Sequence, residues 1–486
     1  MKRSKRLYVL SGVLAVICIV AFWVSRYEQR KEEIKNSDEV ILELAADDVT
    51  ALSWEYDKTK LAFHKDKTWL YDDDKAFPVS EKKVKKLLGI FESFGASFII
   101  ENVEDYGQYG LDKPACSIHI ETAEKSYEVK LGNYSTMDEQ RYISIGDGNV
   151  YLVSTDPMET YEIELKDMIL HDEIPDIEQA DNITFAGSEN YNIIYQKESD
   201  DTYNEDDVYF VSGESGYLPL DTESVKSYLS SISSLRLDNY VSYNATGKEL
   251  AAYGPDNPEL TVTVQHVAQK EDMEDAGSTG KEREKESKTF VLHVSRSAEE
   301  KAKAKKEKSS DKTDTSDSDE SEEESIPAYV RVGDSKIVYE ITEEKYELLM
   351  AASYDELRHQ EVFWADFSKV TKVDISLDGQ NYTLTSKEDG EDTEWSYGEE
   401  TIAIDDFQDA LTNLTVTEFT EDENSDKEEI SLTLYLDDDN FKTAHIALYR
   451  QDGNYCVAVV DGKPTAFVAR NKVVELVEAV NAIVLN

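Results

Sequence analysis

Acidic and amide side chains in short runs are the residues of this sequence that come nearest to a chemical site. The runs are Asp72 to Asp74, Asp437 to Asn440, and Asp422 to Asp426, which reads Asp-x-Asn-x-Asp. Their oxygen atoms are the ligands that calcium prefers. The last run, however, has Lys427 where an EF-hand loop requires glycine, and Thr433 where it requires glutamate. We therefore reject an EF-hand and interpret the other two runs as solvated turns between strands, with weak calcium binding as the open alternative.

Cysteine and histidine residues form no metal-binding or catalytic pattern. Cys18, Cys116 and Cys456 lack the spacing of a metal site or of a disulfide framework. The apolar alternation around Cys116 predicts a buried free thiol rather than a disulfide with Cys456. Three histidines on predicted strands are interpreted as solvent-facing: His119, His266 and His293. No nucleophile elbow, phosphate-binding loop or zinc-binding helix motif occurs. We therefore predict no catalytic residues, no cofactor and no metal site, in a protein that is not an enzyme.

One six-residue pattern, Tyr-Gly-x-Asp-x-Pro, occurs twice, 253 − 109 = 144 residues apart. Its residues are Tyr109, Gly110, Asp112 and Pro114 in the first copy, and Tyr253, Gly254, Asp256 and Pro258 in the second. Glycine after a helical turn adopts the left-handed conformation that ends a helix, and a proline shortly afterwards prevents its continuation. The aspartate can bond to its own backbone within the turn. We interpret the pattern as a helix stop, a turn and the start of a strand; a binding loop is the alternative.

The segments on either side of this pattern also repeat. An apolar stripe with helical spacing precedes each copy, with Ser80 and Asp221 as the predicted N-caps, and the first stripe predicts a helix from Ser80 to Phe94. The stripes are Val84, Leu87, Leu88, Phe91 and Phe94, then Val225, Tyr228, Leu229, Ile232 and Leu235. An alternating strand and a hairpin with a Gly-Asp turn follow each copy. The hairpins begin at Tyr142 to Asp147 and at Tyr329 to Asp334. A third stripe begins at Phe407, but its unit has an acidic run from Glu421 to Glu429 in place of the pattern.

Repeated strands around a single helix indicate an α+β fold with mainly antiparallel sheets. We predict three tandem repeat units, each with one amphipathic helix, over residues 47–172, 180–361 and 366–483, the third being divergent. The second unit carries two charged insertions, near 268–288 and 296–326, which are rich in Lys, Glu, Ser and Asp. Such segments cannot bury a core, so we predict that both are disordered.

Residues 7–24 form an apolar run that is long enough to cross a bilayer as a helix. A basic tail, residues 1–6, precedes the run, and a charged stalk, residues 25–46, follows it. A cleaved signal peptide is the competing interpretation. The run ends in bulky residues such as Trp23, without the small residues that a cleavage site needs, which favours an uncleaved transmembrane anchor. The basic tail predicts a cytoplasmic N-terminus, with the bulk of the chain outside the cytoplasm.

The formal charge of the 486-residue chain is −52, from 51 basic and 103 acidic residues. This charge would repel the phosphates of nucleic acids, so we predict that the chain does not bind nucleic acid. The hydrophobic content of 40% is high enough for folded cores, and it excludes a chain that is disordered throughout.

The anchor, the strand-rich start with its tryptophan, the amphipathic helix, Tyr-Gly-Leu-Asp-Lys-Pro and the Tyr-x-x-x-Gly-Asp hairpin together resemble the domain-of-unknown-function 4340 (DUF4340) family. The resemblance is strongest over residues 47–172, extends over 180–345 and is weak beyond. It implies a bacterial envelope protein that is often encoded beside an ABC transporter of the gliding-motility type. The family has no established activity, so the resemblance assigns no catalytic residue.

Two hypotheses of different class follow. The first is a non-enzymatic, membrane-anchored interaction protein outside the cytoplasm, an accessory of an ABC transporter or of an envelope complex. The alternative is a protein that binds a cell-wall polymer or cations, or an envelope hydrolase without a recognisable motif. A cleft with two converging carboxylates would favour the hydrolase, whereas an even surface of repeats would favour the interaction protein.

Overall fold

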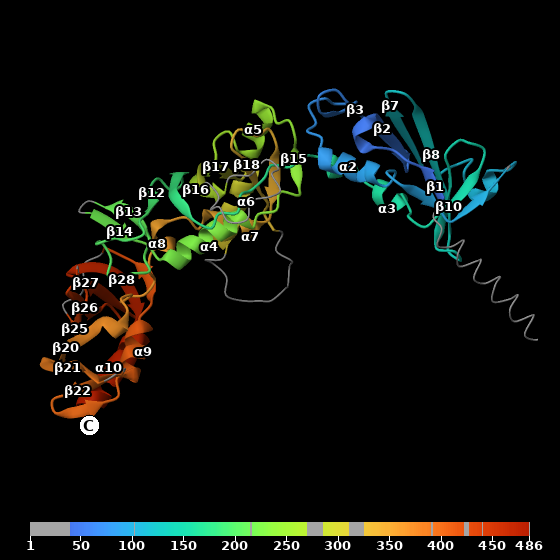
Figure 1. Ribbon diagram of the computed structural model, residues 1–486. Coiled ribbons are helices and arrows are strands. Elements are labelled where there is room, and N and C mark those ends of the chain that lie inside the picture. Colours follow the sequence, from blue (N-terminus) through green and yellow to red (C-terminus); the bar gives the residue numbers. More distant parts are fainter. Residues whose placement is uncertain are drawn as a thin grey trace, which may run out of the picture. The chain divides into compact units, whose positions relative to one another are not determined.

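The computed structural model (Figure 1) describes residues 39–101, 103–213, 216–269, 285–310, 325–389, 392–421, 427–439 and 441–485. The chain divides into two compact units, Met1–Asp172 and Glu173–Asn486. The predicted cytoplasmic tail, the membrane anchor and residues 25–38 of the stalk lie outside the described residues. Within the described residues, no helix has the length and apolar character that a membrane span requires.

The first unit holds one large sheet and a short two-stranded ribbon, β1 with β5. Its strands are β1 (Glu39–Leu42), β2 (Val49–Tyr56), β3 (Thr59–Lys65), β4 (Trp69–Tyr71), β5 (Phe94–Ala96), β6 (Phe98–Ile100), β7 (Cys116–Thr122), β8 (Ser126–Ser135), β9 (Gln140–Ser144) and β10 (Val150–Val153). Its helical segments are η1 (Ala46–Asp48), α2 (Glu81–Gly89), η2 (Gly107–Tyr109), α3 (Met158–Tyr161) and η3 (Leu165–Met168).

The second unit contains two further large sheets. The first of them has the strands β11 (Ala180–Gly187), β12 (Asn192–Tyr195), β13 (Tyr209–Gly213), β14 (Gly216–Pro219), β15 (Tyr240–Ser242), β16 (Leu260–Gln269), β17 (Lys285–Ser295), β18 (Ala328–Val332) and β19 (Val338–Ile341). Its helices are α4 (Thr222–Ser233), α5 (Gly247–Tyr253), α6 (Ala298–Ser310), α7 (Glu343–Met350) and α8 (Tyr354–Leu357).

The last sheet occupies the C-terminal part of the second unit. Its strands are β20 (Val370–Leu377), β21 (Gln380–Asp389), β22 (Asp392–Tyr397), β23 (Glu400–Ile402), β24 (Val416–Phe419), β25 (Glu428–Leu436), β26 (Thr443–Arg450), β27 (Tyr455–Val460) and β28 (Lys463–Ala469). Its helical segments are η4 (Phe367–Lys369), α9 (Asp405–Thr412) and α10 (Arg470–Val484).

All three large sheets follow one strand order, except that the first, as far as the structure describes it, has eight strands and lacks the outermost edge strand that β14 and β23 form in the nine-stranded sheets. The orders are β4-β3-β2-β7-β8-β9-β10-β6, β14-β13-β12-β11-β16-β17-β18-β19-β15, and β23-β22-β21-β20-β25-β26-β27-β28-β24. In each sheet a helix (α2, α4 or α9) follows the strand at one edge, and the chain then reaches the opposite edge. The central pairs β2–β7, β11–β16 and β20–β25 are antiparallel. The predicted α+β class, with mainly antiparallel sheets and a repeated architecture, is therefore confirmed.

The register of the central pair also repeats, down to one irregularity. Its first strand has a register shift near its start in every sheet: between Val49 and Ala51, between Ala180 and Asn182, and between Val370 and Lys372. A bulge of this kind fixes which residues face each side of a sheet. The last sheet shares it although that sheet lacks the Tyr-Gly-x-Asp-x-Pro pattern, so its copy is divergent in sequence and the same in topology.

The crossing helices begin as the sequence predicts. The Ser80 side chain accepts a hydrogen bond from the Lys83 backbone N–H, and Asp221 accepts from the backbone N–H groups of Glu223 and Ser224. The helix α2 is nevertheless shorter than predicted, because it ends at Gly89, and Phe94 already belongs to β5. Both stripe residues beyond the helix, Phe91 and Phe94, remain buried.

Three regions differ from the sequence-based expectation. The predicted stalk already contains β1, whose Val40 pairs with Gly95, and Leu42 is buried, because an apolar strand can complete a ribbon with β5. In the insertion predicted to be disordered over 296–326, Ala298–Ser310 form the helix α6, and Arg296 and Ile326 are buried. In the other insertion, predicted to be disordered near 268–288, residues 285–288 belong to β17 and pair with residues 266–269 of β16. Residues 270–284 and 311–324 lie outside the described residues.

Within the second unit, a loop of the middle sheet inserts into the core of the last one. The Tyr203 ring lies 5.0 Å from that of Trp364 and 5.3 Å from that of Phe441. Beside it, the buried Asp207 carboxylate accepts from Thr202 Oγ1 at 2.7 Å and contacts His359 Nε2 at 2.9 Å. This junction joins the two sheets through both apolar packing and a buried polar network.

Candidate functional site

The repeated six-residue pattern has the same backbone geometry in both copies. Gly110 ends the helical turn η2 with φ 71°, and Gly254 ends α5 with φ 96°, both in the left-handed region. A strand follows each copy, β7 and β16. Asp112 and Asp256 are exposed, and within the described residues their side chains make no hydrogen bond. The turn is closed by backbone hydrogen bonds instead, such as the one from Asn257 N–H to Gly254 O. The expected aspartate bond to the backbone is therefore not found.

Contacts of the pattern run to its own sheet. The rings of Tyr109 and Tyr142 have their centroids 5.0 Å apart, and Tyr253 and Tyr329 repeat this contact at 4.8 Å. In the middle sheet, Ser295 Oγ also donates to the Tyr253 carbonyl at 3.2 Å. The proline residues Pro114 and Pro258 are half-buried at the foot of the following strands. The pattern thus packs on part of the sheet face opposite the crossing helix, and its role in the fold is structural.

The two described cysteines are free and buried. Burial raises the pKa of the Cys116 thiol to about 12 and that of Cys456 to about 11. A thiol that keeps its proton at neutral pH is a poor nucleophile. The sequence-based expectation of a buried free thiol at Cys116 is confirmed, and neither residue is poised for nucleophilic chemistry.

The three strand histidines occupy different environments. His119 is exposed, as predicted, and its ring nitrogen lies 3.9 Å from Glu128. His293 is half-buried beside Thr261, and burial lowers its pKa. The prediction was wrong for His266, which is buried because it lies on the same side of β16 as the buried Leu260, Val262 and Val264; burial also lowers the pKa of this imidazole. The structure does not bring these residues together at one site.

The acidic runs bond locally. Asp72 pairs with His64, and Asp73 accepts from the Tyr71 hydroxyl. This run joins β4 to α2, so the prediction of a turn between two strands is wrong for it; the run at Asp437 does join β25 to β26. The run from Asp422 to Asp426 lies outside the described residues. Among those that the structure describes, no His, Cys, Asp and Glu side chains are grouped as a metal ion would need.

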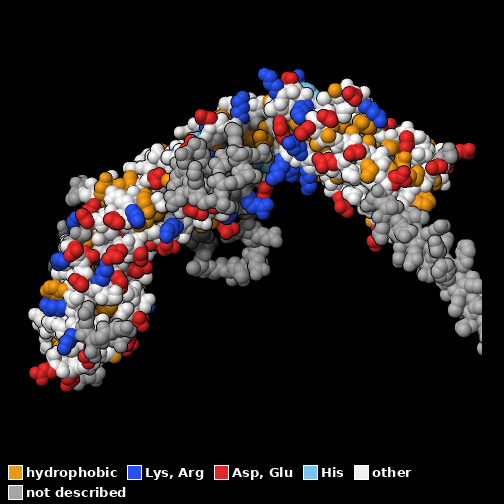
Figure 2. Space-filling model, in the orientation of Figure 1, with side chains coloured by type: hydrophobic (Ala, Val, Ile, Leu, Met, Phe, Trp, Pro, Cys, Tyr) orange, Lys and Arg blue, Asp and Glu red, His pale blue; other side chains and the backbone are white. Residues whose placement is uncertain are grey.

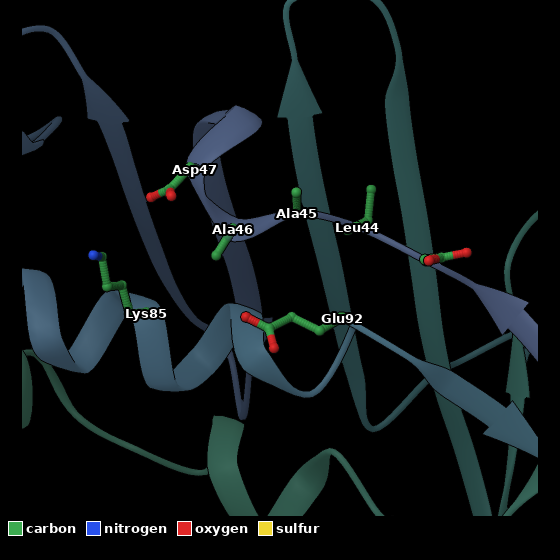
Figure 3. Close-up of a pocket in the computed structure, with 7 residues that line it drawn as sticks. Leu44, Ala45, Ala46, Asp47, Lys85 and Glu92 are labelled. Carbon is green, nitrogen blue, oxygen red and sulfur yellow. The ribbon is translucent and has the colours of Figure 1, made fainter. Parts of the chain in front are cut away.

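Two open depressions mark the surface. The first, of about 400 Å³, lies between η1 and α2 and is lined by Glu43, Leu44, Ala45, Ala46, Asp47, Lys85 and Glu92. In Figure 3, Lys85 projects from α2 on the side of Asp47, and Glu92 lies in the turn three residues after the last residue of that helix, Gly89. The second, of about 470 Å³, lies on the last sheet and is lined by Lys372, Asp374, Ile375, Ser376, Asn381, Tyr382, Thr383, Ser431 and Thr433. Both offer hydrogen-bonding groups on an open surface.

The second depression belongs to a feature that all three sheets share. On the face opposite the crossing helix, the central strand pair carries polar residues in the same register. The cross-strand pairs are Ser53 with His119, Thr184 with Thr263, and Asp374 with Thr433. On the same face, two residues before the second member of each pair, lie Ser117, Thr261 and Ser431. All nine are exposed or half-buried. We call these surfaces the open faces; polar positions alternating with apolar ones were the sequence signal for them.

Comparison with known families gives a match to one family model, described as a domain of unknown function (DUF4340). The model matches residues 69–258 and again residues 213–433. Together these two matches cover more than half of the chain. The chain belongs to the DUF4340 family. No curated protein and no solved structure was found to match it.

The positions of the DUF4340 matches follow the repeats. Their starts are 213 − 69 = 144 residues apart, the same spacing as the two copies of the Tyr-Gly-x-Asp-x-Pro pattern. The first match runs from the start of β4 to Pro258, at the end of the second pattern, and the second match ends within β25 of the last sheet. Each match therefore contains the crossing helices of two successive repeats: α2 and α4 in the first match, α4 and α9 in the second.

Proposed function

We propose that this protein is a non-enzymatic interaction protein, tethered to a membrane by residues 7–24 and acting outside the cytoplasm as an accessory of an ABC transporter or an envelope complex. The observation that carries the proposal is the repetition of the open face in three sheets. A fold requires only that this face be soluble, yet the same positions hold hydrogen-bonding side chains in each repeat.

Surfaces of this kind suit protein contacts. Protein interfaces use about one hydrogen bond per 100–200 Å², spread over a broad area. The open faces supply hydroxyl, imidazole and carboxylate groups at regular strand spacing on a rigid sheet. Rigid positioning lowers the entropy lost on binding, which favours a scaffold of sheets over a set of loops.

A cell-wall polymer is the second candidate ligand, and one observation favours it. The depression on the last sheet brings together the hydroxyl and amide groups of Thr383, Ser431 and Asn381. Hydroxyl-rich polymers can be bound through hydrogen bonds to such groups. This feature concerns one repeat, whereas the polar cross-strand pair recurs in all three, so we favour the protein contact.

Affinity purification from gently solubilised membranes tests the proposal. The full-length protein, with a C-terminal tag, would be purified beside a form that contains residues 37–486. Recovery of ABC transporter subunits with the full-length protein is the expected result. Loss of these subunits from the shorter form would place the contact in the membrane segment, and their retention would place it on the folded units. Recovery of the protein alone, from membranes that contain the transporter, would contradict the proposal.

A further inference from the structure

The crossing helix of the first repeat, α2, carries a basic surface on an acidic chain. Val84, Leu87 and Leu88 are buried against the sheet, while Lys82, Lys83, Lys85 and Lys86 are exposed. In Figure 2 the basic side chains gather over this helix. The formal charge of the whole chain is −52, so a basic cluster of this size on one short helix needs a reason.

The fold does not require these lysines, because two other helices perform the same structural task without them. Within its bounds α2 has four lysines and one glutamate, a net charge of 4 − 1 = +3. The equivalent α4 has one lysine and one glutamate, 1 − 1 = 0, and α9 has three aspartates, 0 − 3 = −3. The three helices share their place between the two edges of a sheet and differ in the charge that they expose.

Partners within the chain also fail to account for the cluster. Over the described part of the chain, no ion pair is recorded for Lys82, Lys83 or Lys86. Lys85 lines the depression that Glu43, Asp47 and Glu92 share (Figure 3). The other three ammonium groups project into solvent on the side of the first sheet that faces away from its open face.

We propose that the exposed surface of α2 is a second docking face, one that binds an acidic protein surface. The charged side chains of this face are lysines, whose flexible ammonium groups can pair with carboxylates at varied positions on a protein surface. Arginine, which binds a phosphate through two parallel hydrogen bonds, is absent from α2. The large apolar side chains of α2 (Val84, Leu87 and Leu88) are buried, so none is exposed among the four lysines to enter a bilayer. Dissolved salt screens the repulsion between an acidic partner and the acidic remainder of this chain beyond about 10 Å, so a compact acidic patch of the partner can still approach α2.

This inference goes beyond the proposed function, because it adds a contact on the side of the first repeat opposite its open face. A protein with both faces can hold two partners at once. The open faces then bind through hydrogen bonds, whereas α2 binds through charge, with a rate of association that falls as salt is added.

A titration with sodium poly-L-glutamate as the probe tests the proposal. The full-length protein, its K82Q/K83Q/K86Q variant and a K248Q/K303Q/K305Q control would be compared in detergent at two salt concentrations. The control removes the same charge from exposed positions on α5 and α6. Glutamine keeps the helix propensity of lysine, so each variant is expected to fold. We expect the α2 variant to bind the polymer about tenfold or more weakly and the control to change by less than about twofold.

The outcomes separate the possible ligand classes. Equal weakening in both variants, or no binding by the unaltered protein, would overturn the proposal. Polyphosphate and phosphatidylglycerol vesicles form the other arms, and α2-dependent binding to either of them without binding to polyglutamate would also overturn it. The two tests fail separately. Weaker polyglutamate binding by the α2 variant supports this docking face even if no transporter subunit is recovered, and recovery of transporter subunits supports the proposed function even if the α2 variant binds polyglutamate as the unaltered protein does.

Discussion

The ring centroids of Tyr253 and Tyr329 lie 4.8 Å apart, and the rings of Tyr109 and Tyr142 make the same contact at 5.0 Å in the first sheet. In each copy the tyrosine immediately precedes a left-handed glycine, so one turn both ends a helical segment and packs on the sheet. The repeated pattern therefore holds the connection between helix and strand in place, and its substitution should be visible as a loss of stability.

We first predict the effects of two glycine substitutions. Gly254→Ala is expected to lower the free energy of unfolding of the second unit by about 2 kcal/mol or more. An added Cβ would lie 2.8 Å from the Arg296 carbonyl oxygen, at a positive φ. Gly110→Ala should cost less, about 1 kcal/mol, because the Cβ would meet the movable side chain of Asn133. Urea unfolding measures both values.

Gly89 provides the matched control. It lies at the end of α2, with nothing within 4 Å of an added Cβ. Gly89→Ala should therefore leave stability unchanged or raise it by up to about 1 kcal/mol. Equal losses at positions 89 and 110 would show that the left-handed turn is not the cause.

A second prediction concerns the tyrosine that precedes the glycine. Tyr253→Ala should destabilise the second unit by about 2 kcal/mol, since it removes the ring contact with Tyr329 and part of the apolar cluster around Ala245 and Val338. Tyr253→Phe keeps the ring and should change stability by less than about 0.5 kcal/mol. A loss on Tyr253→Phe as large as that on Tyr253→Ala would assign the effect to the hydroxyl group instead.

Sequence reasoning reached these turns because their information is local. Alternating Cys116, Ile118 and Ile120 predict a half-buried strand, and glycine with proline predicts where it starts; the structure has β7 there. The N-caps Ser80 and Asp221 were found for the same reason, since a cap and its partner are three residues apart or fewer.

Contacts between distant residues were beyond this reasoning. The Asp207–His359 pair joins residues 152 apart, and nothing near either residue announces the other. The helix α6 was missed because its composition is that of a disordered segment, while Arg296 beside it is held by the Glu343 carboxylate at 2.8 Å. The lysines of α2 can be read from the sequence, but only comparison with the structurally equivalent helices α4 and α9 shows that the fold does not require them.

The junction in the second unit gives a third prediction. Asp207→Ala leaves His359 and Thr202 without their buried partner and should destabilise the unit by about 3 kcal/mol. Because this network joins the two sheets of the second unit, we expect calorimetry to show one transition for that unit in the unaltered protein and two for it in the variant. The control is Glu205→Ala: this carboxylate is 84% exposed in its pair with Lys369, so its loss should cost less than about 0.5 kcal/mol. A single transition of the second unit in Asp207→Ala, at unchanged temperature, would refute the role of the network.

A fourth prediction concerns the thiols, in the form that contains residues 37–486. Neither Cys116 nor Cys456 should react with Ellman's reagent at pH 8 in the folded protein, and both should react in denaturant. The pKa of an unfolded thiol is about 8.5, whereas burial raises the pKa of Cys116 in the folded state to about 12. The unfolded state thus binds fewer protons in this window, so the Cys116 contribution to stability falls as the pH rises through it. Rapid reaction of either thiol at pH 8 before unfolding would contradict the burial described.

Hydroxyl-radical footprinting tests most directly whether the open faces make the partner contact. The full-length protein would be labelled in native membranes and again after purification from its partners. We expect His119 and Tyr435, on the open faces of the first and last sheets, to be labelled less in membranes than after purification. Met137, which is 90% exposed in the connection between β8 and β9, serves as the reference and should be labelled equally in both. Equal labelling of all three residues in the two states would contradict the account.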